Sequence, residues 1–267
     1  MAADRAPTGI DSSKPSAARM YDYYLGGKDN YAVDRRAAED IYAAIPELPD
    51  IARANRAFLQ RAVRFMATEI GIRQFIDIGA GLPTQGNVHE IAHETDPDAG
   101  VVYVDNDPTV LAHGQALLSG ADNTAIIKAD MREPEEILGH PEVQHLIDFD
   151  QPVAVLLIAV LHFVPDELDP AGIVDRFRQA MAPGSYLAIA HATREDRPPD
   201  AVAKMSEVYE RSATPFVFRT HHQVLRLFDG FELVEPGLVH APLWRGDPDG
   251  GRVPGAEWNL GGVARKR

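Results

Sequence analysis

The stretch from Gln74 to Asn87, QFIDIGAGLPTQGN, contains the residue types of a nucleotide-binding turn. Apolar side chains precede Gly79-Ala80-Gly81, and a glycine loop after a strand lets a ligand approach the backbone closely. A dinucleotide fingerprint would then have a third glycine, but this chain has Leu82-Pro83-Thr84. Proline offers no N–H to a diphosphate and cannot replace that glycine sterically. The loop is therefore a damaged dinucleotide site, an ordinary strand-to-helix turn or a site for another ligand.

Acidic residues end the next two apolar runs. Asp105 follows the glycines at roughly the 20-residue spacing at which an acidic side chain meets the ribose of a bound nucleotide. Its two oxygens suit the two hydroxyls of a vicinal diol. Asp130 ends the following run, whereas Asp107 precedes Pro108 and a helical pattern, so we expect Asp107 to cap a helix. Each signal alone is weak, but in combination they predict an adenosine site.

A ligand that contains adenosine but no phosphates would not need the N–H groups that Pro83 removes. S-adenosylmethionine is such a ligand, and its amino-acid end would lie over the glycine loop. A nicotinamide-dependent oxidoreductase is a further possibility, which Pro83 disfavours because NAD carries a diphosphate. Tight binding of NAD would revive that possibility.

The elements that must position these residues alternate along the middle of the chain. Five apolar runs are typical of strands: QFIDIGA, GVVYVD, TAIIKAD, PVAVLLIAV and GSYLAIAHA. Segments with helical spacing lie between them, namely NVHEIAHE, PTVLAHGQALL, EPEEILGHPEVQHL and PAGIVDRFRQAM. This alternation predicts βαβ units and a parallel sheet, which binds ligands at the carboxyl ends of its strands. FELVEPGLV and EWNLGGVARKR are candidate sixth and seventh strands.

Composition excludes several other classes of protein. The 40 acidic residues outnumber the 26 Lys and Arg residues and give a net charge of −14, which argues against a nucleic-acid partner. Cysteine is absent, which excludes disulfides, thiolate metal sites and cysteine nucleophiles. No apolar run approaches the roughly 18 residues of a membrane span, and the start of the chain lacks the apolar core of a signal peptide. We therefore expect a cytoplasmic protein with no membrane partner.

The segments FIDIGAG, VVYVDNDP, KADMRE and VLHFVPD follow in order the landmarks of class I S-adenosylmethionine-dependent methyltransferases, which the chain resembles. More narrowly, ARMYDYYLGGKDNYAVDRRAAE, DIGAGLPTQGNVHEIA and VYVDNDPTVLAHGQALL resemble an actinobacterial family of S-adenosyl methyltransferases whose acceptor is generally unassigned. The resemblance begins near Pro15 and covers nearly the whole chain. We expect an α/β fold with a Rossmann-like sheet of about seven strands, a flexible tail over residues 1–14, a helical cap or lid over 15–70 and the cofactor-binding domain over 71–267.

The resemblance also implies how S-adenosylmethionine would be held. Its methionine portion would lie against Gly79, Ala80 and Gly81, with Asp77 beneath the loop near the ammonium group. Four further residues would contact the rest of the cofactor: Asp105 at the ribose, Asn106 and Asp130 at the adenine, and the Met131 backbone N–H at a ring nitrogen. Ala159 would lie near the methyl group that departs.

The N-terminal region offers three further candidate contacts to the cofactor. Tyr21 and Lys28 lie on either side of Gly26-Gly27, so this segment is either a lid over the cofactor or a helix-turn-helix that packs its aromatic residues on the domain edge. Arg56 could bind the cofactor carboxylate as a fork, the alternative being an exposed arginine on a helix. The polar segment after the fifth strand, broken at Pro198-Pro199, is expected to shape a substrate pocket.

Methyl transfer mainly requires that the acceptor be aligned and water excluded, but a hydroxyl acceptor also needs a base. His162 is the first candidate base and His191 the second, and for each the alternative is a structural role. IAVLHF stands where nucleobase amino methyltransferases have Asn/Asp-Pro-Pro-Tyr/Phe, which counts against methylation of a nucleobase amino group. We expect a small-molecule acceptor, and the sequence does not choose between oxygen and nitrogen as the acceptor atom. The adjacent histidines 221 and 222 lack ligand spacing to further residues, so no metal is expected. A sensor that binds S-adenosylmethionine or S-adenosylhomocysteine without catalysis is the second hypothesis.

Overall fold

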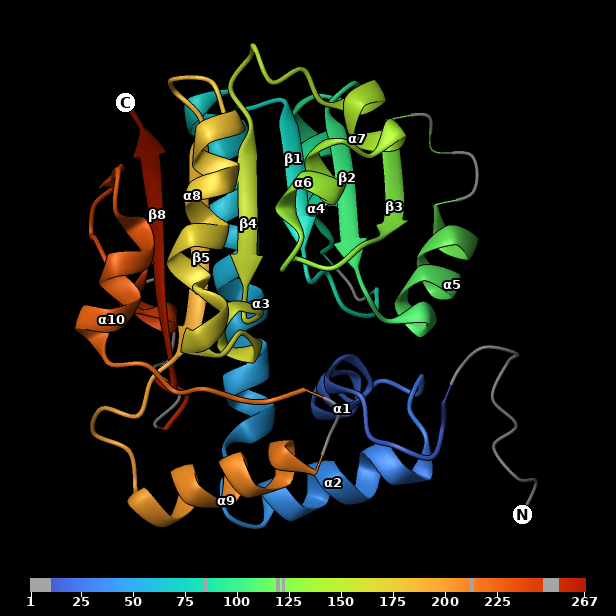
Figure 1. Ribbon diagram of the computed structural model, residues 1–267, viewed down its shortest axis with the longest axis vertical. Coiled ribbons are helices and arrows are strands. Elements are labelled where there is room, and N and C mark those ends of the chain that lie inside the picture. The colour runs from blue at the N-terminus through green and yellow to red at the C-terminus, as the bar shows by residue number, and fades with distance from the viewer. Residues whose placement is uncertain (1–10, 84–85, 119–120, 122, 212–213, 247–254) are drawn as a thin grey trace.

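The apolar runs of the sequence form one mixed sheet in the computed structural model, which describes residues 11–83, 86–118, 121, 123–211, 214–246 and 255–267 (Figure 1). Its strands are β1 (Gln74–Ile78), β2 (Gly100–Asp105), β3 (Thr124–Lys128), β4 (Ala154–Ile158), β5 (Tyr186–Ala192), β6 (Phe231–Leu233), β7 (Val239–His240) and β8 (Asn259–Lys266). The strand order is β3-β2-β1-β4-β5-β8-β6, with β7 paired to β8. β1 to β5 are parallel, and β8 is antiparallel to its neighbours β5 and β6.

This topology confirms the expected Rossmann-like α/β class. The sheet has one strand more than the expected seven, because FELVEPGLV is divided into β6 and β7 by a turn around Pro236. The strand order reverses between β1 and β4, since the chain passes from β1 outward to β3 and returns to the other side of β1. Ligands bind at such a switch point, outside the carboxyl ends of the strands.

Helices cover both faces of the sheet, which explains why β4 is a continuous apolar run with all five residues buried. One face packs against α3 (Leu48–Arg64), the π-helical η1 (Phe65–Ile70) and α4 (Val88–Thr95). The other face packs against α6 (Pro134–Leu138), α7 (Pro141–Leu146), α8 (Pro170–Ala180) and α10 (His221–Leu225). α5 (Pro108–Leu117) packs beside β3 at the sheet edge. EPEEILGHPEVQHL is two helices rather than one, because Gly139 and Pro141 interrupt the pattern.

A helical cap lies beyond the carboxyl ends of the parallel strands (Figure 1). It consists of α1 (Ala17–Tyr24), α2 (Ala32–Tyr42), the first half of α3 and α9 (Pro199–Glu210), which share a separate apolar cluster. α9 comes from the segment that follows β5, so the cap is built from two distant parts of the sequence. The second half of α3 packs on the sheet, which makes α3 the rigid connection between cap and sheet.

Two local features shape the turn between α1 and α2. Gly26 has a φ of 80°, which favours glycine, and a Cβ on Gly27 would lie 1.9 Å from a carboxylate oxygen of Asp22. A buried ion pair then joins the two helices, since the Arg19 Nε lies 2.8 Å from the Asp34 carboxylate. The segment expected to be a lid or a helix-turn-helix is thus two packed helices with a tight glycine turn.

The predicted N-terminal tail is only partly covered by the structure. Residues 1–10 lie outside the described residues, and Asp11 to Ser16 precede α1 without regular structure. The Arg19 guanidinium donates hydrogen bonds to the Asp11 and Lys14 carbonyls, which ties this segment to α1. None of the helices in the described part of the chain combines the length and the apolar character needed to cross a membrane.

Candidate functional site

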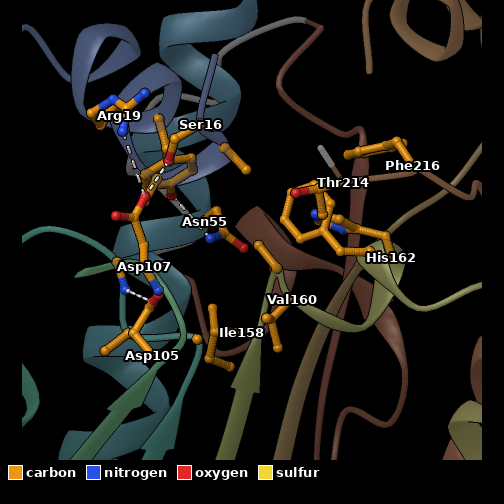
Figure 2. A pocket seen from close by; sticks show the side chains of 18 of the residues that line it. Ser16, Arg19, Asn55, Asp105, Asp107, Ile158, Val160, His162, Thr214 and Phe216 are labelled. Carbon is orange, nitrogen blue, oxygen red and sulfur yellow. Dashed lines mark hydrogen bonds and ion pairs between the residues drawn. The ribbon is translucent and has the colours of Figure 1, made fainter. Parts of the chain in front are cut away.

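A cavity of about 550 Å³ lies between the carboxyl ends of β1, β2 and β4 and the helical cap (Figure 2). This volume falls within the range of about 300–1,000 Å³ that is usual for ligand pockets. Most of the predicted site residues line it: Tyr21, Arg56, Asp77, Gly79, Ala80, Gly81, Asp105, Asn106, Met131, Ala159 and His162. The structure therefore brings together side chains that lie far apart in the sequence.

The loop after β1 needs its glycines for two different reasons. Gly79 has a φ of 72°, and a Cβ there would lie 2.2 Å from a methyl carbon of Val160. Gly81 has a φ of 69°, but its Cβ would meet no atom within 4 Å. The first glycine permits close packing against the end of β4, and the second leaves open space on the cavity side. Ala159, which follows β4 and precedes Val160, is in a left-handed conformation with a φ of 57°.

The backbone N–H groups of this loop are already used inside the protein. Those of Gly79 and Ala80 donate to the Val104 carbonyl, and that of Gly81 donates to the Asp105 carboxylate at 3.0 Å. At the start of α4, the Glu90 carboxylate accepts the N–H groups of Gly86 and Asn87. A diphosphate would need such donors, and it would meet a carboxylate where Glu90 caps the helix. The geometry therefore supports the argument from Pro83 against a dinucleotide.

Asp77 at the carboxyl end of β1 is a buried carboxylate, and Asp105 at the end of β2 is a half-buried one. Burial raises the pKa of Asp77 to about 7, opposed by the nearby Arg56, and burial also raises the pKa of Asp105 to about 6. Asp105 accepts the N–H groups of Gly81 and Asp107, one on each oxygen. No hydrogen bond reaches the Asp77 side chain from any residue in the described ranges. Asp77 thus has free acceptor capacity toward the cavity, and each Asp105 oxygen keeps one further lone pair.

Arg56 is half-buried rather than exposed, which the sequence pattern alone did not indicate. Its Nη2 lies 3.3 Å from the Gly86 carbonyl and 3.5 Å from the Asn87 side-chain oxygen, so both contacts are long. Its Nε is buried without a partner among the residues that the structure describes. A buried unpaired guanidinium N–H is costly, so this arginine is well suited to an anionic group bound beside the glycine loop.

The remaining residues predicted for the adenine end lie at the rim of the cavity. Asn106 lines it and lies 3.4 Å from an Asp130 oxygen. The Asp130 side chain forms an ion pair with Arg132 and is not part of the cavity wall, although its neighbours Ala129 and Met131 are. Asp107 caps α5 as expected, since its carboxylate accepts the Thr109 N–H at 2.8 Å.

The cap is joined to the sheet beside the loops that follow β1 and β2. The Ser16 hydroxyl donates to the Asp107 carboxylate, and the Arg19 Nη1 lies 4.0 Å from an oxygen of the same carboxylate (Figure 2). Tyr21 lines the cavity and donates its hydroxyl hydrogen to the Ala52 carbonyl. Lys28, by contrast, is exposed in the turn between α1 and α2 and is not among the described lining residues, so the structure does not bring it to the site.

The two candidate bases have different environments. His162 is buried at the cavity, its Nδ1 has no partner among the described residues, and burial holds its pKa well below 6.5. The imidazole is therefore neutral and can accept a hydrogen bond. His191 lies behind it and does not line the cavity: its Nδ1 bonds to the Ala192 carbonyl, and its Nε2 accepts from Arg219 at 2.8 Å. With its pKa lowered to about 3 and no free nitrogen, His191 does not provide the expected base and instead fixes Arg219.

Several lining residues were not anticipated from the sequence. They come mainly from the cap and from the segment after α9: Tyr24, Asn55, Met205, Tyr209, Phe216, Phe218 and Trp258. The polar insertion after β5 and the segment around Gly26-Gly27 are the sequence signals for this wall, but they do not show which side chains face inward. His221, which was considered as a metal ligand, hydrogen-bonds to the Leu238 carbonyl.

Comparisons with known proteins agree with this site. The sequence model of a family described as S-adenosyl methyltransferase matches residues 3–267. A DUF574 family protein of Streptomyces avermitilis shares 44% identity, with a TM-score of 0.92 over 97% of this chain and 100% of that protein. A candidate methyltransferase of Thermobifida fusca shares 44% identity, with a TM-score of 0.92 over 99% of this chain and 100% of that protein. None of the curated proteins gives a significant match.

More distant structures share the fold alone. An O-methyltransferase family protein of Burkholderia thailandensis is 13% identical, with a TM-score of 0.52 over 95% of this chain and 64% of its own. The N-methyltransferase NodS of Bradyrhizobium japonicum is 13% identical, with a TM-score of 0.51 over 81% of this chain and 97% of its own. The full-length family match and the two close structures establish the identity: this chain belongs to the S-adenosyl methyltransferase family and is an S-adenosylmethionine-dependent methyltransferase.

Proposed function

We propose that this protein transfers the methyl group of S-adenosylmethionine to an oxygen or nitrogen atom of a small molecule held under the helical cap. The observation that carries the proposal is the continuity of the cavity. One half is bounded by the glycine loop and the acidic ends of β1 and β2, and the other by aromatic residues around His162, among them Tyr209 of α9 and Phe216. A cofactor in the first half would present its methyl group to a molecule in the second.

The first half fits the functional groups of the cofactor one by one. Asp77 offers acceptor capacity for the ammonium group and Arg56 an unpaired guanidinium N–H for the carboxylate. Asp105 would accept the ribose hydroxyls, with Asn106 and Met131 toward the adenine. Asp130 could serve the adenine amino group only if its ion pair with Arg132 yielded to the ligand. The cofactor supplies a methyl group on positively charged sulfur.

The second half fits an acceptor of limited size. The cap helices α1, α3 and α9 close this half of the cavity, and their apolar cluster is continuous with its wall. A macromolecular acceptor would have to extend a segment through the cap, and the net charge of −14 disfavours nucleic acid. Enclosure also excludes water, which is the main protein contribution to methyl transfer apart from alignment. A sensor of the cofactor alone would have no need of this half.

His162 is the residue placed to handle the acceptor's proton. Its unpartnered, neutral imidazole is buried at the boundary between the two halves, next to Val160 at the end of β4 (Figure 2). A hydroxyl donating to this ring would be oriented with its oxygen toward the methyl group, and the ring would receive the proton as the new bond forms. A neutral amine acceptor could be oriented in the same way.

The test is transfer of a labelled methyl group. Purified protein would be incubated with methyl-labelled S-adenosylmethionine and a protein-free, low-molecular-weight culture extract of a Streptomyces species, and products would be separated by mass. We expect label in a small-molecule product, loss of transfer in Gly81→Val, whose side chain would enter the cofactor space, and unchanged transfer in the exposed control His222→Ala. Cofactor binding without label in any small molecule, or label in nucleic acid or protein, would contradict the proposal.

A further inference from the structure

Six aromatic residues form a connected wall on the acceptor side of the cavity: His162, Phe163, Tyr209, Phe216, Phe218 and Trp258. Phe216 lies at its centre, with ring centroids 4.4 Å from His162, 4.8 Å from Tyr209 and 4.9 Å from Phe218. The plane of the Phe216 ring is tilted by 31° from that of His162 and by 28° from that of Tyr209. We call these six residues the aromatic wall.

The aromatic wall carries no formal charge. The charged side chains among the described lining residues come from residues 11–19, from Arg56 and from the ends of β1 and β2, all outside the wall. Arg197 lies 5.7 Å from the Trp258 ring but is not a lining residue. The His162 imidazole within the wall is neutral, for the reason given above. A charged acceptor would therefore be buried without a partner, which is costly.

The sulfonium of the cofactor adds a second argument against a cationic acceptor. Aromatic rings attract cations, so the wall alone could bind an ammonium group. In the transfer geometry, however, the reacting atom must approach a positively charged sulfur, and two like charges a few ångströms apart repel strongly in a water-poor site. A neutral ring avoids this repulsion and still gains offset or edge contacts with the wall.

Polar groups opposite the wall can hold an uncharged substituent. The Asn55 amide donates to the Tyr21 hydroxyl at 3.0 Å, and the Asn259 amide lies 3.4 Å from the Asn55 oxygen. Both asparagines are buried and line the cavity. Each carboxamide has two donors and an acceptor oxygen, so this chain of contacts leaves capacity for a hydroxyl or carbonyl group.

From these observations we infer that the methyl acceptor is an uncharged aromatic small molecule with at least one hydrogen-bonding substituent. Its ring packs against the aromatic wall, and its substituents meet His162 on one side and the Asn55–Asn259 pair on the other. This inference rests on the proposed function, because it names the kind of methyl acceptor that binds in the second half of the same cavity.

Four matched probes test it by calorimetric titration into protein saturated with S-adenosylhomocysteine. They are 2-naphthol, the aliphatic decahydro-2-naphthol, the anionic 2-naphthoate and the cationic 2-(aminomethyl)naphthalene. We expect a Kd for 2-naphthol at least fivefold lower than for each of the others. The inference is overturned if another probe binds as tightly as 2-naphthol, or if 2-naphthol does not bind while S-adenosylhomocysteine does. Failure of S-adenosylhomocysteine itself to bind would instead contradict the proposed function.

Two variants locate the binding. Phe216→Leu keeps an apolar side chain but removes the central ring of the wall, so the Kd of 2-naphthol should rise at least fivefold while that of S-adenosylhomocysteine stays unchanged. The matched control Tyr42→Leu removes an exposed ring on α2 outside the cavity and should alter neither. Unchanged 2-naphthol affinity in Phe216→Leu would show that the probe binds elsewhere and would overturn the assignment to the wall.

Discussion

Gly79 and Gly81, in the loop after β1, can be replaced one at a time to compare a glycine needed for packing with one that borders open space. Both have a positive φ, so Gly→Ala at either position should cost about 1–2 kcal/mol of backbone strain. At Gly79 the new Cβ would also lie 2.2 Å from Val160, and relieving such overpacking typically costs about 1–3 kcal/mol more. At Gly81 nothing lies within 4 Å of the new atom.

We therefore expect Gly79→Ala to lower the free energy of unfolding by about 2–5 kcal/mol and Gly81→Ala by only about 1–2 kcal/mol. Urea titration of the two variants and the unsubstituted protein measures both values. Gly81→Ala should nevertheless weaken S-adenosylmethionine binding at 25 °C, because its methyl group enters the space where the methionine portion would lie. Equal stability losses, or full cofactor affinity in Gly81→Ala, would refute this account of the loop.

The other predictions concern three polar residues of the cavity. The pKa of Asp77 in the folded protein, about 7, lies above its usual value of 3.8, so between pH 4 and pH 7 the folded protein binds more protons at this group than the unfolded chain does. The contribution of Asp77 to stability is therefore fully present below about pH 4 and is lost as the pH rises through 7. Asp77→Asn should flatten this part of the pH dependence in urea titrations from pH 4 to 8, and an unchanged slope would contradict it. If Asp77 receives the cofactor ammonium, S-adenosylmethionine affinity should rise with pH up to about 7, and calorimetry should find this rise missing in Asp77→Asn. His162→Ala should lower kcat for a hydroxyl acceptor by about 10²–10⁴-fold with cofactor affinity unchanged; full turnover would remove the base assignment but not the enzyme assignment. Arg56→Met should weaken S-adenosylmethionine at least tenfold but leave the affinity for 5′-methylthioadenosine, which lacks the carboxylate, unchanged.

The features that the sequence predicts best are those that depend on residues close together in the chain. The strands β1 to β5 follow from their apolar runs, and the cap of α5 follows from Asp107 and Pro108. The ends of the parallel strands must converge, so the grouping of Asp77, Asp105 and the glycine loop could be inferred before any coordinates.

What the sequence does not predict depends on tertiary contacts. α9 joins the cap although more than a hundred residues separate it from α1, and this contact is what turns Tyr209 toward the cavity. Asp105 and His191 both lie near the carboxyl ends of parallel strands, which is why both could be expected at the cavity. Arg219, from a later segment of the chain, hydrogen-bonds to the His191 Nε2. Arg56 has the sequence neighbours of an exposed helical arginine, but in the fold it is half-buried and contacts Gly86 and Asn87.

We expect S-adenosylmethionine to bind at the glycine loop with its ribose held by Asp105. Calorimetric titration with S-adenosylmethionine, S-adenosylhomocysteine and NAD tests this binding site, using the unsubstituted protein, Asp105→Ala and the exposed control Lys28→Ala. We expect micromolar binding of the first two ligands and none of NAD. Their affinity should fall at least tenfold in Asp105→Ala, because hydrogen bonds to a charged group contribute about 1.5–3 kcal/mol, and should stay unchanged in Lys28→Ala. Binding of NAD alone, or full affinity for S-adenosylmethionine in Asp105→Ala, would contradict this binding site.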